Sequence, residues 1–317
     1  MPILKLKIGS RVSPLAWWQA EAVKKKLEIL SPGIQIEIIG IKTSGDKFLN
    51  QPLYEIGGKG LFVKELEKAL LQQEIDLAVH SMKDMPQEIA AGLSLSSILK
   101  RDAVEDVFVS QDFSHFHQLP PNSRIGTSSL RRQVLVQRLR PDLKIQAIRG
   151  NIQTRLEKIN QKEVDAVILA KAGLERMGLK YQEILNWQNF LPALGQGALA
   201  AQWRSDNHLL SEFLATAVDF ETETCARVER SFLKHLCGNC LSPVGGLALF
   251  KGSGKFNLHF QGGLFSPFSK KDFYTTLSGS KETPEELGRA AAQEIFNQGG
   301  KEVLDLCAKN PQFFSKG

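Results

Sequence analysis

IDLAVHSMKDMP, residues 75–86, joins a short apolar run to a polar loop. The run at 75–80 has the length of a buried strand, and it follows an amphipathic stretch at 61–72 that predicts a helix. Working outward, we expect a strand at 4–9, a helix from Ser13-Pro14 to about Leu30, and a strand at 34–41. This alternation is typical of an α/β fold with parallel strands and right-handed crossovers.

The same alternation resumes after about residue 104. We expect strands ending at 124–126, 144–148 and 166–169, with helices at 129–139, 152–159 and 172–177. The stretch 191–202 predicts a strand after a glycine loop, followed by a helix near 207–217. Between the first elements, the polar, glycine-bearing residues 43–60 predict a mobile loop.

The last hundred residues have a different pattern. A helix is expected at about 220–236, and alternating runs with glycine turns follow at 244–250, 255–264 and 272–278. Such runs favour an antiparallel sheet. Two helices, near 283–297 and 300–309, complete what we interpret as a small α+β domain.

Composition limits the classes of protein. A chain of 317 residues corresponds to two or three domains, at about 100–200 residues each. The first residues do not have the pattern of a signal peptide, and no stretch is apolar enough to span a membrane, so we expect a cytoplasmic protein with no membrane contact. Four cysteines in a chain of this length do not predict a disulfide framework.

Asp84 is the first candidate for chemistry. It follows Lys83 at the carboxyl end of an expected parallel strand, where open α/β sheets bind ligands. Lys83 can keep the carboxylate ionised or supply a cation for a substrate carboxylate. The alternative is a surface ion pair, which is common and weak.

A second candidate is the stretch Gly126-Thr127-Ser128-Ser129, which leads into Arg131 and Arg132 in the first turn of a helix. Backbone N–H groups and the helix dipole favour an anion there, whereas cations work against the dipole. We therefore expect a bound carboxylate or phosphate, which arginine grips in a bidentate manner. The alternative is a pair of exposed arginines over a capped helix.

Further arginines fall at or near other strand ends: Arg11, Arg149, Arg155 and Arg176. Together they favour a cleft that binds several carboxylates. The net charge of +6 leaves nucleic acid as a rival ligand. Because no basic stripe is interleaved with aromatic residues, we expect no nucleic-acid binding.

The motif Cys237-Gly238-Asn239-Cys240 has no second CxxC and no paired histidines, so we expect no metal site. The spacing leaves open a redox pair, a nucleophile and an attachment point.

Taken together, these segments resemble the porphobilinogen deaminase family. The matching segments are SRVSPLAWWQAE (10–21), GGKGLFVKELE (57–67), DLAVHSMKDMP (76–86), GTSSLRRQ (126–133), RGNIQTRL (149–156), ILAKAGLERMGL (168–179), LPALGQGA (191–198) and CGNCLSPVGG (237–246). HSMKD and GTSSLRR are the most specific.

The resemblance implies three domains: two α/β lobes similar to periplasmic binding proteins, and a smaller α+β C-terminal domain with an antiparallel sheet. Residues 1–100 and 198–218 would form the first lobe and residues 101–197 the second, because the chain would cross between them twice. Residues 219–317 would form the third domain, which carries the cofactor cysteine.

The resemblance also implies the reaction. Four porphobilinogen molecules join head to tail with loss of ammonia, giving hydroxymethylbilane. A dipyrromethane cofactor, held by a thioether on Cys240, primes the chain. Asp84 would transfer protons and stabilise the cation left when ammonia departs.

The remaining roles follow from the same resemblance. Cofactor contacts would come from Arg11, Ser13, Lys83, Thr127, Ser128, Ser129, Arg131, Arg132, Arg149, Gly150 and Arg155. Substrate contacts would come from Arg11, Gln19, Phe62, Arg149, Arg155, Arg176 and Gln196. Gly57, Gly58 and Lys59 would belong to a mobile lid. We expect a monomer.

The sequence departs from the family around the cysteine. The family usually has Gly-Gly-Cys-Gln, where this chain has Gly238-Asn239-Cys240-Leu241 followed by Ser242. Asn tolerates a left-handed backbone better than most residues, so the loop shape is expected to survive. Cys237 offers a second thiol. The alternative function is a two-lobed module that binds small anions without catalysis.

Overall fold

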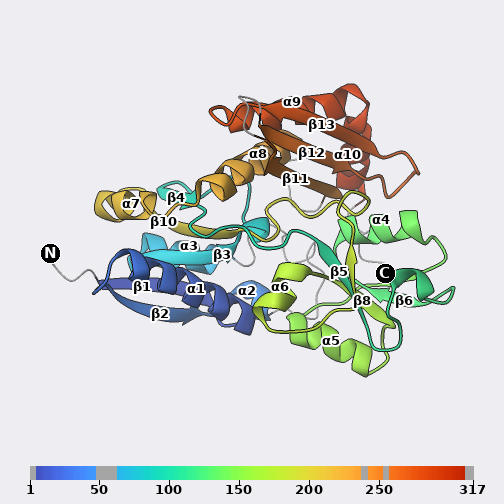
Figure 1. Ribbon diagram of the computed structural model, residues 1–317, viewed down its shortest axis with the longest axis horizontal. Coiled ribbons are helices and arrows are strands. Elements are labelled where there is room, and N and C mark those ends of the chain that lie inside the picture. Colours follow the sequence, from blue (N-terminus) through green and yellow to red (C-terminus); the bar gives the residue numbers. More distant parts are fainter. Residues whose placement is uncertain (1–4, 48–62, 237–241, 253–256, 311–317) are drawn as a thin grey trace.

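The computed structural model describes residues 5–47, 63–236, 242–252 and 257–310, which fold into three parts built around three sheets (Figure 1). The predicted α/β class with a smaller antiparallel C-terminal domain is confirmed. Within the described ranges, no helix is both long and apolar enough to cross a membrane.

The first sheet has the strand order β2-β1-β3-β10-β4. Its strands are β1 (Lys5–Arg11), β2 (Gln35–Ile41), β3 (Leu77–Ser81), β4 (Leu93–Ser96) and β10 (Leu199–Arg204). β1 pairs in parallel with both β2 and β3, but β10 runs antiparallel to β3 and β4. The three strands predicted to run parallel do so, and the sheet is mixed because the chain leaves it after β4 and β10 re-enters it in the opposite direction.

Helices α1 (Pro14–Leu30), α2 (Ser44–Lys47), α3 (Lys64–Leu71) and α7 (His208–Ala215) belong to the same part. The α1 helix begins where its sequence predicts, since Ser13 caps it by accepting a hydrogen bond from the Ala16 backbone N–H. Its buried residues recur every three or four positions and pack on the sheet, with Val23 and Leu27 in the same core as Leu77. The α2 helix lies inside the stretch predicted as a loop, and the rest of that stretch, 48–60, is outside the described residues.

The second sheet has the order β7-β6-β8-β5-β9. It consists of β5 (Asp106–Ser110), β6 (Arg124–Gly126), β7 (Lys144–Gln146), β8 (Ala166–Ala170) and β9 (Glu183–Leu185). Helices α4 (Leu130–Leu139), α5 (Ile152–Asn160) and α6 (Lys171–Arg176) follow β6, β7 and β8. Here β5 is antiparallel to β8 and β9, so this sheet too is mixed.

The third part packs helices on one three-stranded antiparallel sheet. Its strands are β11 (Val244–Phe250), β12 (Leu258–Leu264) and β13 (Phe273–Gly279), with β12 in the centre. Helices α8 (Phe220–Leu236), α9 (Pro284–Asn297) and α10 (Gly300–Lys309) share a core with the sheet that includes Phe232 and Phe260. This part lies above the other two in Figure 1.

Two chain segments connect the first two parts, and they lie side by side where all three parts meet. The Asp102 backbone N–H donates to the carbonyl of Gly197 at 3.2 Å. Gly197 has a φ of +86°, and a Cβ there would lie 2.5 Å from the Asp102 carbonyl oxygen, so only glycine permits this approach. Arg101 on the outgoing segment donates to Glu229 of α8 at 2.6 Å, which ties the crossing to the third part.

Candidate functional site

Asp84 lies where β3 ends. β3 is buried over Leu77–His80, and a 3₁₀ turn at Met82–Asp84 then brings the acid to the surface. The Asp84 side chain is exposed and lines a small pocket of about 20 Å³ that we call the Asp84 pocket. Its walls are Arg11, Ala16, Gln19, Val63, Val79, His80 and Ser81. The carboxyl end of the strand thus presents an accessible carboxylate.

Lys83 points into the protein rather than away from it. Its Nζ donates to Oε1 of Gln196 at 3.3 Å, and Nε2 of Gln196 donates to Asp106 at 2.9 Å. Burial lowers the pKa of Lys83 to about 8, helped by Arg132 and opposed by the carboxylate of Asp84. Lys83 is therefore linked by hydrogen bonds through Gln196 to the second sheet.

Arg131 and Arg132 are buried, and both bind one internal carboxylate. Arg131 donates to Oδ2 of Asp106 at 2.8 Å, and Arg132 donates to Oδ1 at 2.7 Å. Burial alone would raise the pKa of Asp106, but the two guanidinium groups outweigh it and hold the pKa well below its ordinary value. A bound ligand is thus not needed to explain cations in this first turn, because Asp106 already neutralises part of their charge. The alternative of two exposed arginines is wrong, because both side chains are buried, and the predicted bound anion stays a prediction.

One donor of this cluster remains unused. Nε of Arg132 is buried and has no hydrogen-bond partner within the described residues. Its guanidinium is otherwise held by Asp106 and by the carbonyl of Ile168 at 2.9 Å. A buried donor without a partner carries a desolvation cost, which a bound acceptor would remove.

Arg155 brings the second sheet's cations close to Asp84. Burial lowers the pKa of Arg155 to about 10, Arg132 and Arg149 lower it further, and the Asp84 carboxylate raises it. Its Nε donates to the carbonyl of Gly150 at 3.0 Å, which fixes the guanidinium at the start of α5. Gly150 has a φ of +103°, and a Cβ there would collide with the Thr154 side chain.

The three hydroxyl residues before α4 make local contacts. Oγ1 of Thr127 accepts from the Ser129 backbone N–H at 3.2 Å, and the Ser128 hydroxyl donates to the carbonyl of Ile148 at 2.6 Å. Ser129 caps α4. These bonds stabilise the turn before α4. The contacts of the three residues with the cofactor stay a prediction.

Gln19 lies on α1 and lines the Asp84 pocket, whereas Ser13 precedes this helix and caps it. Nε2 of Gln19 donates to the Ser81 hydroxyl at 3.0 Å. Arg11 ends β1 and forms another wall of the pocket. The first strand and first helix therefore supply polar groups to the same pocket as Asp84.

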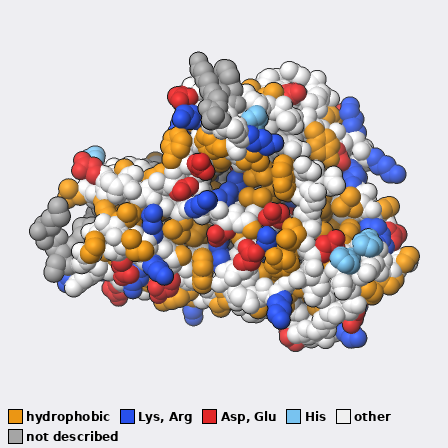
Figure 2. All heavy atoms as spheres, viewed as in Figure 1, with side chains coloured by type: hydrophobic (Ala, Val, Ile, Leu, Met, Phe, Trp, Pro, Cys, Tyr) orange, Lys and Arg blue, Asp and Glu red, His pale blue; other side chains and the backbone are white. Residues whose placement is uncertain are grey.

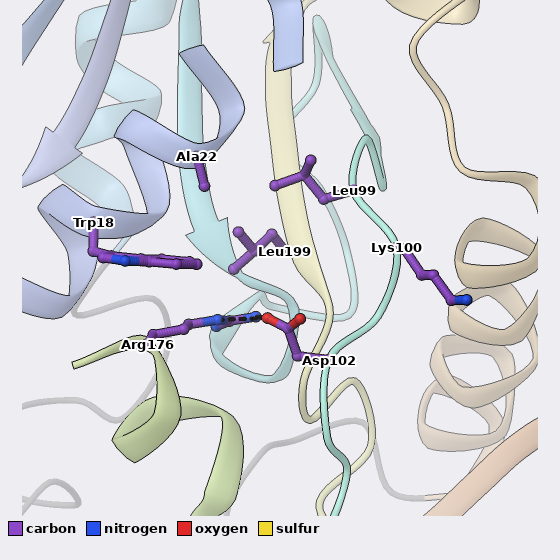
Figure 3. Close-up of a pocket in the computed structure, with 7 residues that line it drawn as sticks. All are labelled: Trp18, Ala22, Leu99, Lys100, Asp102, Arg176 and Leu199. Carbon is purple, nitrogen blue, oxygen red and sulfur yellow. Dashed lines mark hydrogen bonds and ion pairs between the residues drawn. The ribbon is translucent and has the colours of Figure 1, made fainter. Parts of the chain in front are cut away.

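Arg176 lies elsewhere. Figure 3 shows it beneath the Trp18 ring and pointing at Asp102, in a separate hollow of about 270 Å³ that Lys100 and Leu199 also line. It donates to Asp102 at 2.8 Å and to the carbonyl of Gly197 at 2.7 Å, and its guanidinium is 5.6 Å from the Trp18 ring. The structure does not bring Arg176 into the Asp84 pocket.

Five predicted site residues lie outside the described residues: Gly57, Gly58, Lys59, Phe62 and Cys240. Their roles stay predictions.

Two buried acids that bind arginines were missed by the sequence patterns. Asp106 opens β5, a strand that was not predicted, and the acid beside the apolar run Val107–Val109 was the only signal. Glu229 of α8 is fully buried and binds Arg101 as well as the backbone N–H groups of Gly195 and Ala248. Helical spacing gives no hint of such partners, which come from distant parts of the chain.

Charged side chains on the face drawn in Figure 2 are mixed in sign, with Lys and Arg interspersed among Asp and Glu near the middle of the molecule. In the interior, the Arg131–Arg132–Asp106 cluster likewise pairs cations with an acid.

Comparison with known families shows to which family this chain belongs. Residues 6–212 match the model described as "Porphobilinogen deaminase, dipyromethane cofactor binding domain", and residues 223–297 match "Porphobilinogen deaminase, C-terminal domain". The chain belongs to the porphobilinogen deaminase family. The resemblance inferred from HSMKD and GTSSLRR is confirmed.

Curated porphobilinogen deaminases align along almost the whole chain. The protein of Trichlorobacter lovleyi is 43% identical over 303 residues, covering 95% of this chain and 96% of that protein. The protein of Acidithiobacillus ferrooxidans is 42% identical over 302 residues, covering 95% and 97%. Among solved structures, a periplasmic substrate-binding protein of an ABC transporter from Coxiella burnetii aligns at 16% identity with a TM-score of 0.42, covering 67% of this chain and 91% of that one.

Proposed function

We propose that this chain is a transferase that condenses four porphobilinogen molecules head to tail, releasing one ammonia per condensation and giving hydroxymethylbilane. The observation that carries the proposal is the exposed Asp84 carboxylate, which stands at a strand end with Lys83 and Arg155 beside it. Membership of the family favours this function over a small-anion binding module that lacks catalysis.

The donor set fits a dipyrromethane cofactor. Each pyrrole carries an acetate and a propionate, so the cofactor needs several fixed cations, and guanidinium groups grip carboxylates in two places. Arg155 offers donors for this purpose, and so does Nε of Arg132, which has no partner in the part of the chain that the structure describes. When bound through Cys240, the cofactor supplies the pyrrole carbon at which the chain starts.

Each of the further residues proposed to hold the cofactor lies at a strand end or at the start of a helix. They are Arg11, Ser13, Lys83, Thr127, Ser128, Ser129, Arg131, Arg149 and Gly150. Arg131 would act mainly by position, because its guanidinium is occupied by Asp106 and by the carbonyl of Leu191 at 2.6 Å.

Some of the residues predicted to contact the substrate are proposed to touch it, and others are proposed to act by position. Gln19, Arg11, Arg149, Arg155 and Phe62 are proposed to touch porphobilinogen. Gln196 is fully buried, and both its amide hydrogens are engaged, by the Val104 carbonyl and by Asp106. Gln196 and Arg176 therefore suit a positioning role better than direct contact.

Asp84 is proposed to handle protons and charge. Loss of ammonia from porphobilinogen requires a proton on the amine and leaves a positive charge on the pyrrole. A carboxylate held near that pyrrole lowers the energy of the cation, and it can take the proton released when the new carbon–carbon bond forms. The cations around it hold the carboxylates of the substrate in place while this happens.

The domain division, the location and the oligomeric state belong to this proposal. Residues 1–100 with 198–218, 101–197, and 219–317 are proposed as the three domains, a division supported by the three sheets. We also propose a cytoplasmic monomer that binds no nucleic acid and no membrane, with Gly57, Gly58 and Lys59 in a lid.

Intact-mass spectrometry of the purified chain tests the function. The chain should carry the added mass of two condensed pyrroles, and Cys240→Ser should lose it while the matched control Cys237→Ser keeps it. Fully active enzyme with the unmodified chain mass would contradict the proposal. An adduct retained in Cys240→Ser but lost in Cys237→Ser would move the attachment to the other thiol.

A further inference from the structure

The turn that carries Asp84 packs against α8, a helix of the third part. Met82 and Met85 lie before and after Asp84 in this turn, and both are buried in one apolar cluster with Ala226 of α8. The exposed Asp84 is thus carried by a turn whose flanking side chains are anchored on another part of the protein.

Arg230 holds the chain directly after this turn. It lies one helical turn beyond Ala226 on α8, and its Nη2 donates to the carbonyl of Pro86 at 3.0 Å and to that of Gln87 at 2.9 Å. Residues four apart lie on the same side of a helix, so one side of α8 contacts both the turn and the residues that follow it. A single guanidinium nitrogen therefore binds two successive peptide groups.

Glu229, the neighbour of Arg230, contacts the segment that packs on this turn. Its Oε2 accepts a hydrogen bond from the Gly195 backbone N–H at 2.5 Å. Gly195 has a φ of +75°, and a Cβ there would lie 2.9 Å from the backbone nitrogen of Lys83, so this segment lies directly against the turn. The α8 helix thus supports the turn directly through Arg230 and indirectly through Glu229.

This support matters because the turn has little regular structure of its own. The regular structure that contains Asp84 is a 3₁₀ helix of three residues, Met82–Asp84, and the hydrogen bonds of such short pieces have poor geometry. Displacing a reacting group by about 1 Å can cost about 100-fold in rate. An exposed carboxylate on so short a turn therefore needs to be fixed from outside the turn.

We propose that Arg230 is a positioning residue whose guanidinium holds the backbone after Asp84 and thereby fixes the Asp84 carboxylate for the proposed reaction. This inference rests on the proposed function, in which Asp84 serves the chemistry. Arg230 acts through the turn, since the hydrogens of its Nη2 are engaged by the two carbonyls.

Arg230→Met removes the two hydrogen bonds and keeps an unbranched side chain. The matched control is Arg227→Met, because Arg227 lies on the same helix but binds Glu285 of α9, within the third part, at 2.6 and 3.0 Å. We expect kcat for porphobilinogen to fall about 10- to 100-fold in Arg230→Met, with KM within about twofold. In Arg227→Met, kcat should stay within about twofold of wild type.

A double-mutant cycle with Asp84→Asn separates positioning from a general effect on the fold. If Arg230 acts by placing the Asp84 carboxylate, its loss has nothing left to misplace once that carboxylate is gone. Arg230→Met should therefore change the residual kcat by no more than about twofold in a chain that also carries Asp84→Asn. A structural role would lower kcat by the same factor with and without the carboxylate.

Arg230→Lys gives the same comparison with less disturbance of the fold. An ammonium can donate to both carbonyls, but it lies nearer to α8 than Nη2 does, so the turn is held less well. We expect kcat to fall about 2- to 5-fold, and this loss to be absent in the presence of Asp84→Asn. This variant decides the question if Arg230→Met does not fold or carries no pyrrole adduct.

Wild-type kcat in Arg230→Met, or an equal loss with and without Asp84→Asn, would overturn the inference. For Arg230→Lys, no loss or an equal loss in both backgrounds has the same meaning. Intact mass is measured on each variant, and rates are expressed per chain that carries the adduct. Failure of the proposed function is distinguishable, because it would remove the adduct and turnover from the wild type, whereas failure of this inference leaves both in place.

Discussion

Asp84 and Asp106 are two aspartates beside cations, but they differ in burial and in their partners. Asp106 is fully buried at the start of β5 and binds two guanidinium groups and one amide. Asp84 is exposed after β3 and lines a pocket. Both lie close to Lys83, and both raise its pKa, although burial and the arginines prevail.

The contrast shows how the proposed anion-binding site can bury its cations. Buried cations without a counter-ion are costly, so the protein supplies Asp106 as a permanent partner. The same cluster reaches the Asp84 pocket through Arg155 and Lys83, where its remaining positive charge is available to a ligand. We therefore propose that Asp106 serves stability and that Asp84 serves the chemistry.

The largest effect is expected for Asp84→Asn. It removes the carboxylate charge while keeping its shape, so turnover of porphobilinogen should fall about 100- to 10,000-fold. Because Asp84 is exposed, the free energy of unfolding of the protein should change by less than about 0.5 kcal/mol in this variant. Asp112→Asn, at an exposed position away from the pocket, is the control for both measurements. Turnover near wild type in Asp84→Asn would contradict the proposed difference in role between Asp84 and Asp106.

Asp106→Asn should have the opposite profile. Two buried arginines lose their counter-ion, so urea unfolding should show a loss of about 3–5 kcal/mol. The matched control is Asp102→Asn, which removes the half-exposed partner of Arg176 and should cost no more than about 1 kcal/mol. Equal losses in the two variants would mean that burial of the ion pair is not what matters.

The pH dependence of the free energy of unfolding tests the role of Asp106 in the same comparison. The folded pKa of Asp106 is below its unfolded value, so its contribution is fully present above the unfolded pKa and is lost as pH falls toward the folded pKa. The stability difference between wild type and Asp106→Asn should therefore stay constant from neutral pH down to about pH 5 and shrink in more acidic solution. A difference that grows on acidification would contradict this assignment.

The smallest effect is expected for Lys83→Met. The folded pKa of Lys83 is about 8, below its ordinary 10.5, so between these values the unfolded chain binds more protons. Stability linked to Lys83 must then rise with pH across that window. The wild type should gain stability relative to Lys83→Met between about pH 8 and 10, as measured by urea unfolding at several pH values. A flat difference would show that the Lys83 pKa is not lowered.

The sequence predicts most local structure because the signals are local. Ser13-Pro14 begins α1 as expected, and the glycine-flanked run Val244–Phe250 is a strand with the predicted bounds. The strands β4, β5 and β9 were missed. Length alone does not explain this, because β6 and β7 have only three residues each and were predicted from their alternation with the helices that follow them. The direction of β10 was also beyond a local pattern, because it depends on where the chain re-enters the sheet.

By itself, the sequence determined the α/β class, the position of Asp84 at a strand end and the family. Helix caps, hydrophobic periods and short motifs depend only on residues that are close together in the chain. Only the tertiary structure decided which charges pair. Arg131 and Arg132 meet Asp106 across about 25 positions of chain, and Arg101 meets Glu229 across 128. Whether a cation binds a ligand or an internal acid depends on burial and distance, which the order of residues does not contain.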